Sequence, residues 1–181
     1  MKVFLKFKQS FLELRSFKNL SMLAVLMALL LVLNFMVVEV SNLVSISFEF
    51  IILFLTGAMF GPFVAAILGF VGDLFCYLVH PIGPFFIWYA VSFMVDGLIY
   101  GFFLYKNRLE TKRVVVIQVL RDILVNVFLN TFFIWLQFGG DFLKLLFFVR
   151  IPKNIIKIPV NCFIMVFISK ILRKKLKQLK D

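Results

Sequence analysis

The chain has 181 residues, of which 63% are hydrophobic, and its mean hydropathy is +1.06. Apolar runs long enough to cross a bilayer recur along it, so the composition excludes an ordinary soluble domain, which is only about 45–50% apolar, and predicts a polytopic helical membrane protein. The net charge of +11 comes mainly from lysines and arginines that flank apolar segments, and this placement argues against a nucleic-acid partner.

The chain divides into a membrane domain with a basic segment on each side. Residues 1–18 are a basic, partly amphipathic arm that we expect to lie at the cytoplasmic surface. Residues 19–172 form one membrane domain, and residues 173–181 are a basic cytoplasmic tail. The spans predicted within the domain cover residues 19–38, 48–60, 62–79, 85–105, 114–137 and 142–168. The second of these is short for a full crossing.

The basic residues orient these spans. With six spans, both termini and the basic loop 106–113 fall on one side of the membrane. The connections at 39–47, 80–84 and 138–141 fall on the other side and contain no lysine or arginine. Because cytoplasmic loops carry the excess of positive charge, we predict an all-α bundle of six transmembrane helices with both termini cytoplasmic. A bundle of five spans would place one basic terminus outside.

The last span carries polar residues that a lipid-facing helix would not have. They share one helical face, with spacings of three, four and seven residues from the first: Arg150, Lys153, Asn154 and Lys157. Charged groups inside a membrane segment usually face the bundle interior or a cavity. In the predicted orientation Arg150 and Asn154 lie in the outer half of the membrane, so Arg150 cannot reach the cytoplasmic surface. The long side chains of Lys153 and Lys157 can each point away from this polar face.

The fifth span has a polar residue at every fourth position: Gln118, Asp122, Asn126 and Asn130. Such amides can simply hold neighbouring helices together. However, the depth of Asn126 and Asn130 matches that of Arg150 and Asn154 on the sixth span. We therefore expect the two spans to share a polar cavity.

The third span contributes a carboxylate to the same half of the membrane. Asp73 lies one turn from Tyr77, and either it neutralises Arg150 or it accepts paired N–H donors from a ligand. Trp88 belongs to an outer aromatic segment on which a planar ligand could stack. Asp96 is expected to be neutral or paired with a polar group of the fifth or sixth span. Arg121 and Asp122 form a local pair or part of a coupling surface.

Small residues predict close approach of helices at two places. One is Ala24 and Ala28 in the first span, a possible docking face for a partner, and the other is Gly61, Ala65 and Gly69 in the third span.

The sequence lacks the common catalytic and metal-binding signatures. It contains no phosphate-binding Gly-x-x-x-x-Gly-Lys-Ser/Thr loop, no His-Glu-x-x-His and no Gly-x-Ser-x-Gly. His80 is the only histidine, and Cys76 and Cys162 lie in separate apolar segments. We therefore expect no enzyme activity, no metal and no cofactor in this chain.

Several segments recur in the order known from one transporter family: Phe60-Gly-Pro62, Gly72-Asp73-Leu74, Pro81-Ile-Gly-Pro-Phe85, Gly97-Leu-Ile-Tyr-Gly101, Asn130-Thr131 and Arg150-x-x-Lys-Asn154-x-x-x-x-Pro159. With Ala24-x-x-x-Ala28 and six short-looped spans, residues 17–172 resemble the substrate-binding membrane subunits (S components) of energy-coupling factor (ECF) vitamin transporters. Within that family they resemble the folate-specific members.

The resemblance implies a subunit of the bacterial plasma membrane that captures folate from outside and releases it across the membrane. Its partners would be a transmembrane coupling protein, docked on Ala24 and Ala28, and two cytosolic ATPases. Folate has a planar pterin with adjacent N–H donors and an anionic glutamate tail. Asp73 suits the donors, and Arg150 suits either a carboxylate or a pterin oxygen.

The residues predicted to bind substrate are Asp73, Tyr77, Trp88, Asn126, Asn130, Arg150, Lys153 and Asn154. Two alternatives stay open, namely an S component for another vitamin and a membrane scaffold or channel subunit that binds no solute. A cationic vitamin is disfavoured, because like charges repel strongly at low dielectric constant.

Overall fold

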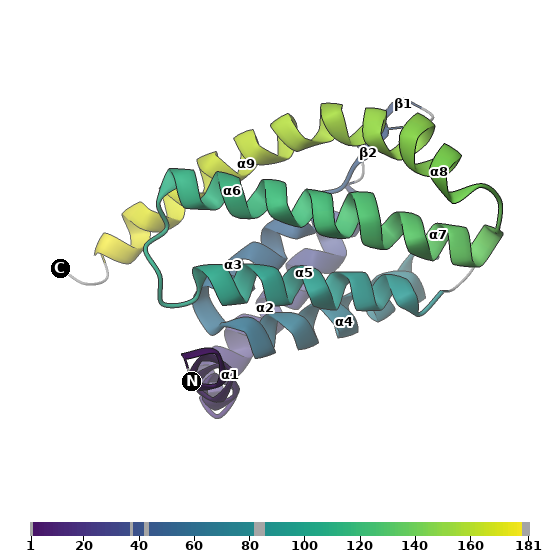
Figure 1. The fold of residues 1–181 in the computed structure, drawn as a ribbon. Helices are drawn as coiled ribbons and strands as arrows, with labels where there is room; N and C mark the ends of the chain where they lie inside the picture. The colour runs from purple at the N-terminus through teal and green to yellow at the C-terminus, as the bar shows by residue number, and fades with distance from the viewer. Residues whose placement is uncertain (1, 37, 42–43, 82–85, 179–181) are drawn as a thin grey trace.

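The protein is a bundle of helices with one short hairpin (Figure 1). The computed structural model describes residues 2–36, 38–41, 44–81 and 86–178. The part of the predicted segment Pro81-Ile-Gly-Pro-Phe85 that follows Pro81 lies outside the described residues. The elements before the long connection at residues 105–110 are α1 (Lys2–Glu13), α2 (Phe17–Phe35), β1 (Val38–Ser41), β2 (Val44–Ile46), α3 (Phe50–Phe60), α4 (Pro62–Val79) and α5 (Trp88–Leu104).

Two long helical stretches follow, and each contains a π-helical segment. The first comprises α6 (Thr111–Arg121), η1 (Asp122–Leu129) and α7 (Asn130–Phe138). The second comprises α8 (Phe142–Lys144), η2 (Leu145–Arg150) and α9 (Ile151–Gln178). Pro152 is the second residue of α9, just after η2, and a proline has no N–H to continue an α-helical ladder. Such π turns are rare and occur frequently at functional sites.

The connection after α2 and the last helix each show a feature that was not predicted from the sequence. Residues 39–47 were expected to form a loop, and within this connection β1 and β2 pair antiparallel, with Val38 opposite Ile46. The alternating branched residues of this segment favour a strand. The last membrane span was expected to cover residues 142–168, and the helix α9 continues beyond it to Gln178 through the basic tail, which contains no glycine or proline to end it.

The tightest packing lies between α4 and α5. A Cβ atom added to Gly97 of α5 would lie 2.3 Å from the Ala65 carbonyl oxygen, and one added to Gly69 of α4 would lie 2.4 Å from the Phe93 carbonyl oxygen. The two backbones therefore touch, which confirms the close approach predicted for this face of α4. Gly61 ends α3 because its backbone adopts φ +90°, and Pro62 then begins α4.

The amphipathic helix α1 packs across one end of α4 and α5. Ser10 is fully buried, and its Oγ donates to the Phe60 carbonyl (2.6 Å) and accepts from the Val64 N–H (3.1 Å). Lys6 Nζ donates to the Phe102 carbonyl (2.9 Å). The arm thus holds the turn between α3 and α4.

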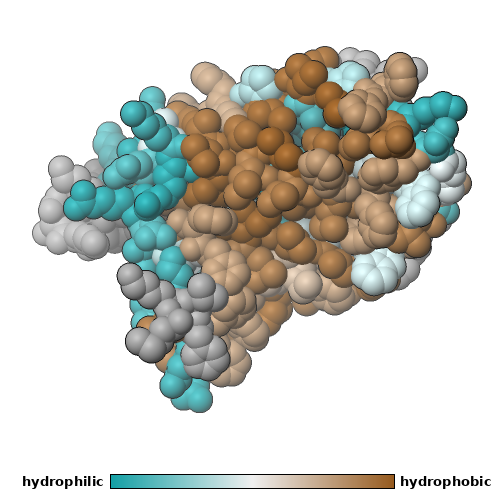
Figure 2. All heavy atoms as spheres, viewed as in Figure 1, coloured by the Kyte–Doolittle hydropathy of each residue, from teal (hydrophilic) through white to brown (hydrophobic). Residues whose placement is uncertain are grey.

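The two ends of the bundle differ in charge. Both termini and the connection between α5 and α6 lie at the left end in Figure 1, and the hairpin and the α7–α8 turn lie at the other end. Hydrophilic side chains gather at the left end of Figure 2, beside a broad hydrophobic middle. We call these the basic end and the hairpin end.

Four helical stretches of the described chain are long and apolar enough to cross a membrane: Phe17–Phe35, Pro62–Val79, Thr111–Phe138 and Ile151–Lys174. The apolar helices α3 and α5 are shorter. Large apolar side chains are widely exposed, among them Phe148 (80%), Phe163 (76%) and Leu78 (75%). A soluble monomer does not expose so much apolar surface, and the chain is a multi-pass membrane protein.

Candidate functional site

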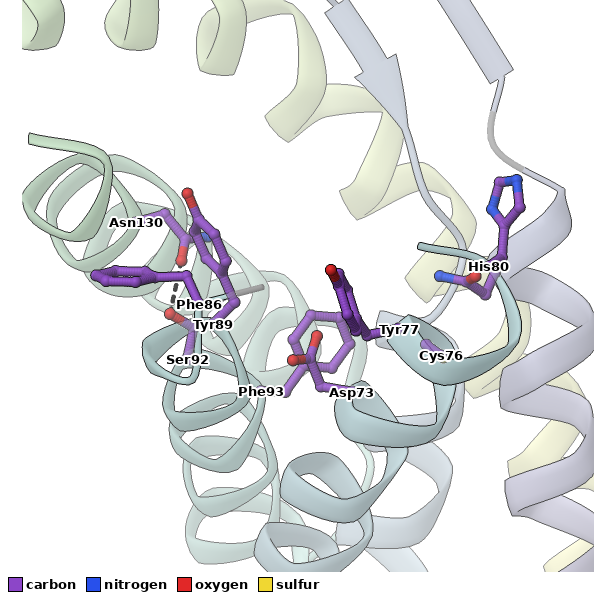
Figure 3. A pocket seen from close by; sticks show the side chains of 10 residues that line it. Asp73, Cys76, Tyr77, His80, Phe86, Tyr89, Ser92, Phe93 and Asn130 are labelled. Atoms are coloured by element: carbon purple, nitrogen blue, oxygen red, sulfur yellow. Dashed lines mark hydrogen bonds between the residues drawn. The ribbon is translucent and has the colours of Figure 1, made fainter. Parts of the chain in front are cut away.

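A cavity of about 210 Å³ opens at the hairpin end of the bundle (Figure 3). Its walls come from the last turns of α2 and α4 and the first turns of α5 and α7. The lining residues are Asn34, Asp73, Cys76, Tyr77, His80, Phe86, Tyr89, Ser92, Phe93 and Asn130. The cavity therefore lies in the half of the bundle where the sequence places the polar site.

Asp73 is the charged group of this cavity. In Figure 3 its carboxylate lies beside the Phe93 ring, between a wall of α4 residues and a wall that carries Tyr89, Ser92 and Asn130. The side chain is half-buried, and no hydrogen bond or ion pair joins it to another described residue. A half-buried carboxylate without a partner is costly, unless a ligand supplies donors.

Two amides face the cavity as acceptors. Asn130 Oδ1 accepts from Ser92 Oγ at 2.6 Å (dashed in Figure 3). Asn34 Nδ2 donates to Glu49 Oε1 at 2.5 Å, which leaves Asn34 Oδ1 buried without a hydrogen-bond partner among the described residues. Glu49 itself is buried at 6% exposure. Together with Asp73 these groups form a surface of acceptors, which suits a ligand edge with several N–H donors.

Aromatic rings line the mouth on the α5 side. Phe86 packs edge-on against Tyr89 with centroids 5.6 Å apart, and the Tyr89 hydroxyl donates to Gln137 Oε1 at 3.0 Å. Trp88, predicted to stack on a ligand, is 46% exposed and packs on Phe133 instead. Trp88 lies one turn before Ser92, so helical spacing alone does not separate the two. The contact with Phe133 accounts for the position of the Trp88 ring.

The structure brings only part of the predicted set to the cavity. Asp73, Tyr77 and Asn130 line it, whereas Trp88, Asn126, Arg150, Lys153 and Asn154 do not. Asn154 is 4% exposed, and its Nδ2 donates back to the Arg150 carbonyl (2.9 Å). Among the polar cavity residues, sequence reasoning missed Asn34 and Ser92. For Asn34, one polar residue near the end of an apolar span was a usable signal.

Arg150 does not line the cavity, but its charge reaches one of the lining residues. Its side chain is half-buried, and its charge acts on Tyr89. No ion pair joins Arg150 to Asp73 or to any other carboxylate in the described part of the chain. Of the two alternatives for Asp73, the structure therefore does not show the one in which it pairs with Arg150.

A second polar group, the buried ion cluster, lies deeper in the bundle. Arg121 (7% exposed) bridges two carboxylates: its Nε donates to Asp96 Oδ1 at 2.7 Å, its Nη2 donates to Asp96 Oδ2, and its Nη1 donates to Asp122 Oδ1 at 2.9 Å. Asp96 is thus paired with the fifth span, one of the two expected arrangements. The charges of Glu49 and Lys157 act on the same cluster.

Amides complete the cluster around Asp122, which is fully buried. Its carboxylate accepts from Gln118 Nε2 (3.0 Å), Asn126 Nδ2 (2.7 Å) and Asn161 Nδ2 (3.3 Å). The Tyr100 hydroxyl donates to Gln118 Oε1 at 2.7 Å. These bonds join α5, α6, η1 and α9. In the described residues, no group of three or more histidine, cysteine, aspartate or glutamate side chains is arranged to hold a metal ion.

Comparison with known proteins identifies the family. The sequence profile of the substrate-specific components of ECF transporters matches residues 18–169, most of the chain. The chain belongs to this family. The resemblance seen in its motifs is thereby confirmed.

Two relatives of this S component carry the same name. The chain is 35% identical to "Folate transporter FolT" of Clostridium novyi (strain NT) over 123 residues, which are 67% of this chain and 70% of the relative. It is 30% identical to "Folate transporter FolT" of Leuconostoc mesenteroides subsp. mesenteroides over 156 residues, 81% of this chain and 82% of the relative.

A solved structure shares the fold of this S component. The structure described as "Crystal structure of FolT bound with folic acid" superposes with a TM-score of 0.77 at 28% identity. The superposition covers 86% of this chain and 94% of the other.

Proposed function

We propose that this S component captures folate from the outer side of the bacterial plasma membrane and delivers it across the membrane with an ATP-driven coupling module. Its family, the FolT relatives and the similar fold of a FolT bound to folic acid support this assignment. The single observation that carries it is the half-buried Asp73 carboxylate, which faces the cavity without a partner among the described residues.

The pterin ring occupies the cavity in this proposal. Asp73 accepts two adjacent N–H groups of the ring, a charge-assisted pairing about twice as strong as a neutral hydrogen bond. Asn130 and Asn34 contact other polar atoms of the ring edge. Tyr77 and Phe86 lie on opposite walls (Figure 3) and contact the faces of a planar ring.

The glutamate tail leaves the cavity on the side of Tyr89. The cavity volume of about 210 Å³ is below the roughly 300–1,000 Å³ of a pocket that encloses a whole drug-sized ligand. Arg150, beyond Tyr89, then meets a carboxylate of the tail through its planar fork. Lys153 lies within electrostatic reach of Arg150 and adds positive charge there. Asn126, Asn154 and Trp88 support the site from behind its walls.

We place the basic end in the cytoplasm, with six membrane crossings and both termini inside. The lysines and arginines of α1, of the 106–113 connection and of the C-terminal part of α9 support this orientation. The cavity then opens to the outside. The short helix α3 completes its crossing with the residues that join it to β2.

A coupling protein docks on α2, and two cytosolic ATPases drive the cycle. Ala24 and Ala28 are both exposed on α2, where small side chains let another helix approach closely. Leu23, Leu26 and Leu30 are buried on the opposite face of the same helix, so the alanines are free to meet a partner.

Titration calorimetry of the purified protein with folate tests the proposal. We expect one tight site per chain and at least tenfold weaker binding by Asp73→Asn, which keeps the size of the side chain but removes its charge. Asp141→Asn is the matched control, because Asp141 is exposed at the α7–α8 turn. Thiamine, a cationic vitamin, is expected not to compete. No heat with folate, or equal affinity of the two variants, would refute the proposal.

A further inference from the structure

A continuous row of hydrogen bonds joins the buried ion cluster to the cavity. Asn126 Nδ2 donates to Asp122 Oδ1 (2.7 Å), and Asn130 Nδ2 donates to Asn126 Oδ1 (3.4 Å). Asn130 Oδ1 then accepts from Ser92 Oγ (2.6 Å) at the cavity wall. We call Asp122, Asn126 and Asn130 the amide row.

Asp122 determines which group donates and which accepts in every hydrogen bond of the amide row. Arg121, Gln118 and Asn161 also donate to the Asp122 carboxylate, so both of its oxygens act as acceptors. Asn126 must therefore turn its NH₂ group toward Asp122 and its oxygen away from it. Asn130 must in turn offer its NH₂ group to that oxygen. One buried charge thus leaves the oxygen of Asn130 on the cavity side.

The helix geometry supports the row. Asp122 and Asn126 lie in the π segment η1, and Asn130 is the first residue of α7. A π turn is wider than an α turn, so residues four apart lie closer to one line along the mixed helix than they do in a regular α-helix. The unusual segment thereby aligns the three side chains over two turns.

The opposite wall repeats the arrangement. Glu49 lies outside the cavity, and its Oε1 accepts from Asn34 Nδ2 at 2.5 Å. The positive charges of Lys157 and Arg121 act on this carboxylate. Asn34 Oδ1 is left buried at the cavity without a partner among the described residues. Two carboxylates outside the cavity therefore each orient an amide that lines it.

We propose that Asp122 and Glu49 are positioning residues that determine specificity by fixing Asn130 and Asn34 as hydrogen-bond acceptors. The cavity then presents acceptors on both walls and selects a ligand edge by its pattern of N–H donors. This inference rests on the proposed function only for the choice of ligand in the first test.

The first test compares two ligands that differ on one edge. Folate carries a 4-oxo group, whereas aminopterin carries a 4-amino group and lacks the N3 proton. Asp122→Asn and Glu49→Gln keep the side-chain size but let the neighbouring amide turn. We expect each variant to weaken folate binding about 3–10-fold, as for the loss of one oriented hydrogen bond. We also expect the ratio of the two Kd values to move at least fivefold toward one.

Asn161→Leu is the matched control. It removes a donor to Asp122 from α9 but leaves every bond between members of the amide row in place. It should therefore lower the thermal midpoint and leave the ratio of Kd values within twofold of wild type. A merely structural role for Asp122 predicts equal weakening of both ligands in Asp122→Asn. That result would overturn the inference.

The second test needs no ligand and separates this inference from the folate assignment. Thermal midpoints are measured for Asp122→Asn, Asn130→Ala and the double variant. If the row is coupled, the shift of the thermal midpoint in the double variant should differ from the sum of the two single shifts by at least about 2 °C. This difference should disappear when Asn126→Leu interrupts the row. Additive shifts would overturn the row even if folate binds. Coupling without folate binding would refute only the proposed function.

Discussion

Replacing Arg121 by methionine removes the only hydrogen-bonding partner that Asp96 has in the described chain. Asp96 is 1% exposed, so its carboxylate cannot turn to water. Asp122, by contrast, keeps three amide donors in this variant. Breaking a buried ion pair by removing one partner costs about 3–5 kcal/mol, because the remaining charge stays buried.

This loss of stability corresponds to a large decrease in the midpoint temperature of unfolding. One kcal/mol lowers the midpoint by roughly 2–4 °C in a chain of 150–250 residues, so Arg121→Met should lower it by about 6–20 °C. Fluorescence of Trp88 and Trp135 during heating in detergent reports the transition. A shift of less than about 2 °C would refute the inference that Asp96 depends on Arg121.

The double variant Arg121→Met with Asp96→Leu separates charge from packing. It removes both members of the pair and leaves no unpaired charge at Asp96, so it should recover most of the lost stability, since apolar replacements of buried ion pairs are often neutral. If the double variant is as unstable as the single one, the loss comes from packing around Arg121, and the electrostatic argument is wrong.

Three further predictions concern binding, docking and packing. Arg150→Ala should weaken folate at least tenfold and 6-hydroxymethylpterin, which lacks the tail, less than twofold; equal losses measured by calorimetry would contradict a contact with the tail. Ala24→Trp should abolish folate uptake in cells that express the whole transporter but leave calorimetric binding unchanged, whereas loss of both would exclude a docking role. Gly97→Ala should reduce the yield of monodisperse protein severely, because its Cβ would lie 2.3 Å from a carbonyl oxygen. Gly72→Ala should be tolerated, because its Cβ would meet only the ends of side chains, those of Leu30 at 3.3 Å and Met27 at 3.6 Å. Equal yields in size-exclusion chromatography would contradict the backbone contact.

Much of the helical framework follows from the sequence. Gly61-Pro62 and the polar end of the apolar run predict the third span as residues 62–79, which are the bounds of α4. The glycine and alanine face of that span predicts the close approach of another helix, which in the structure is α5. These features are local, because apolar runs, proline and glycine act on the residues next to them.

The pairing of Asp96 with Arg121 could not be chosen from the sequence. The two residues are 25 positions apart on different helices, and only the packing of α5 against α6 brings them together. The contact of Glu49 is hidden for the same reason, since it precedes α3 and meets Asn34 at the end of α2. Contacts between distant residues depend on how helices rotate about their axes, which the apolar pattern of an almost wholly apolar helix does not define.

The structure brings together only some of the residues that the sequence predicts at one depth. Asp73 and Asn130 were expected at one level, and both line the cavity. Arg150 was expected at the same level but does not line the cavity. Counting residues along a helix gives the height of a side chain, while its lateral position depends on which neighbours the helix packs against.

Identifying the molecule that the purified protein retains tests the central claim most directly. Wild-type protein extracted in a mild detergent and examined by native mass spectrometry should carry one folate per chain. Asp73→Asn prepared in parallel should carry little or none. A different retained molecule, or equal folate retention by the variant, would contradict the claim that this cavity binds folate through Asp73.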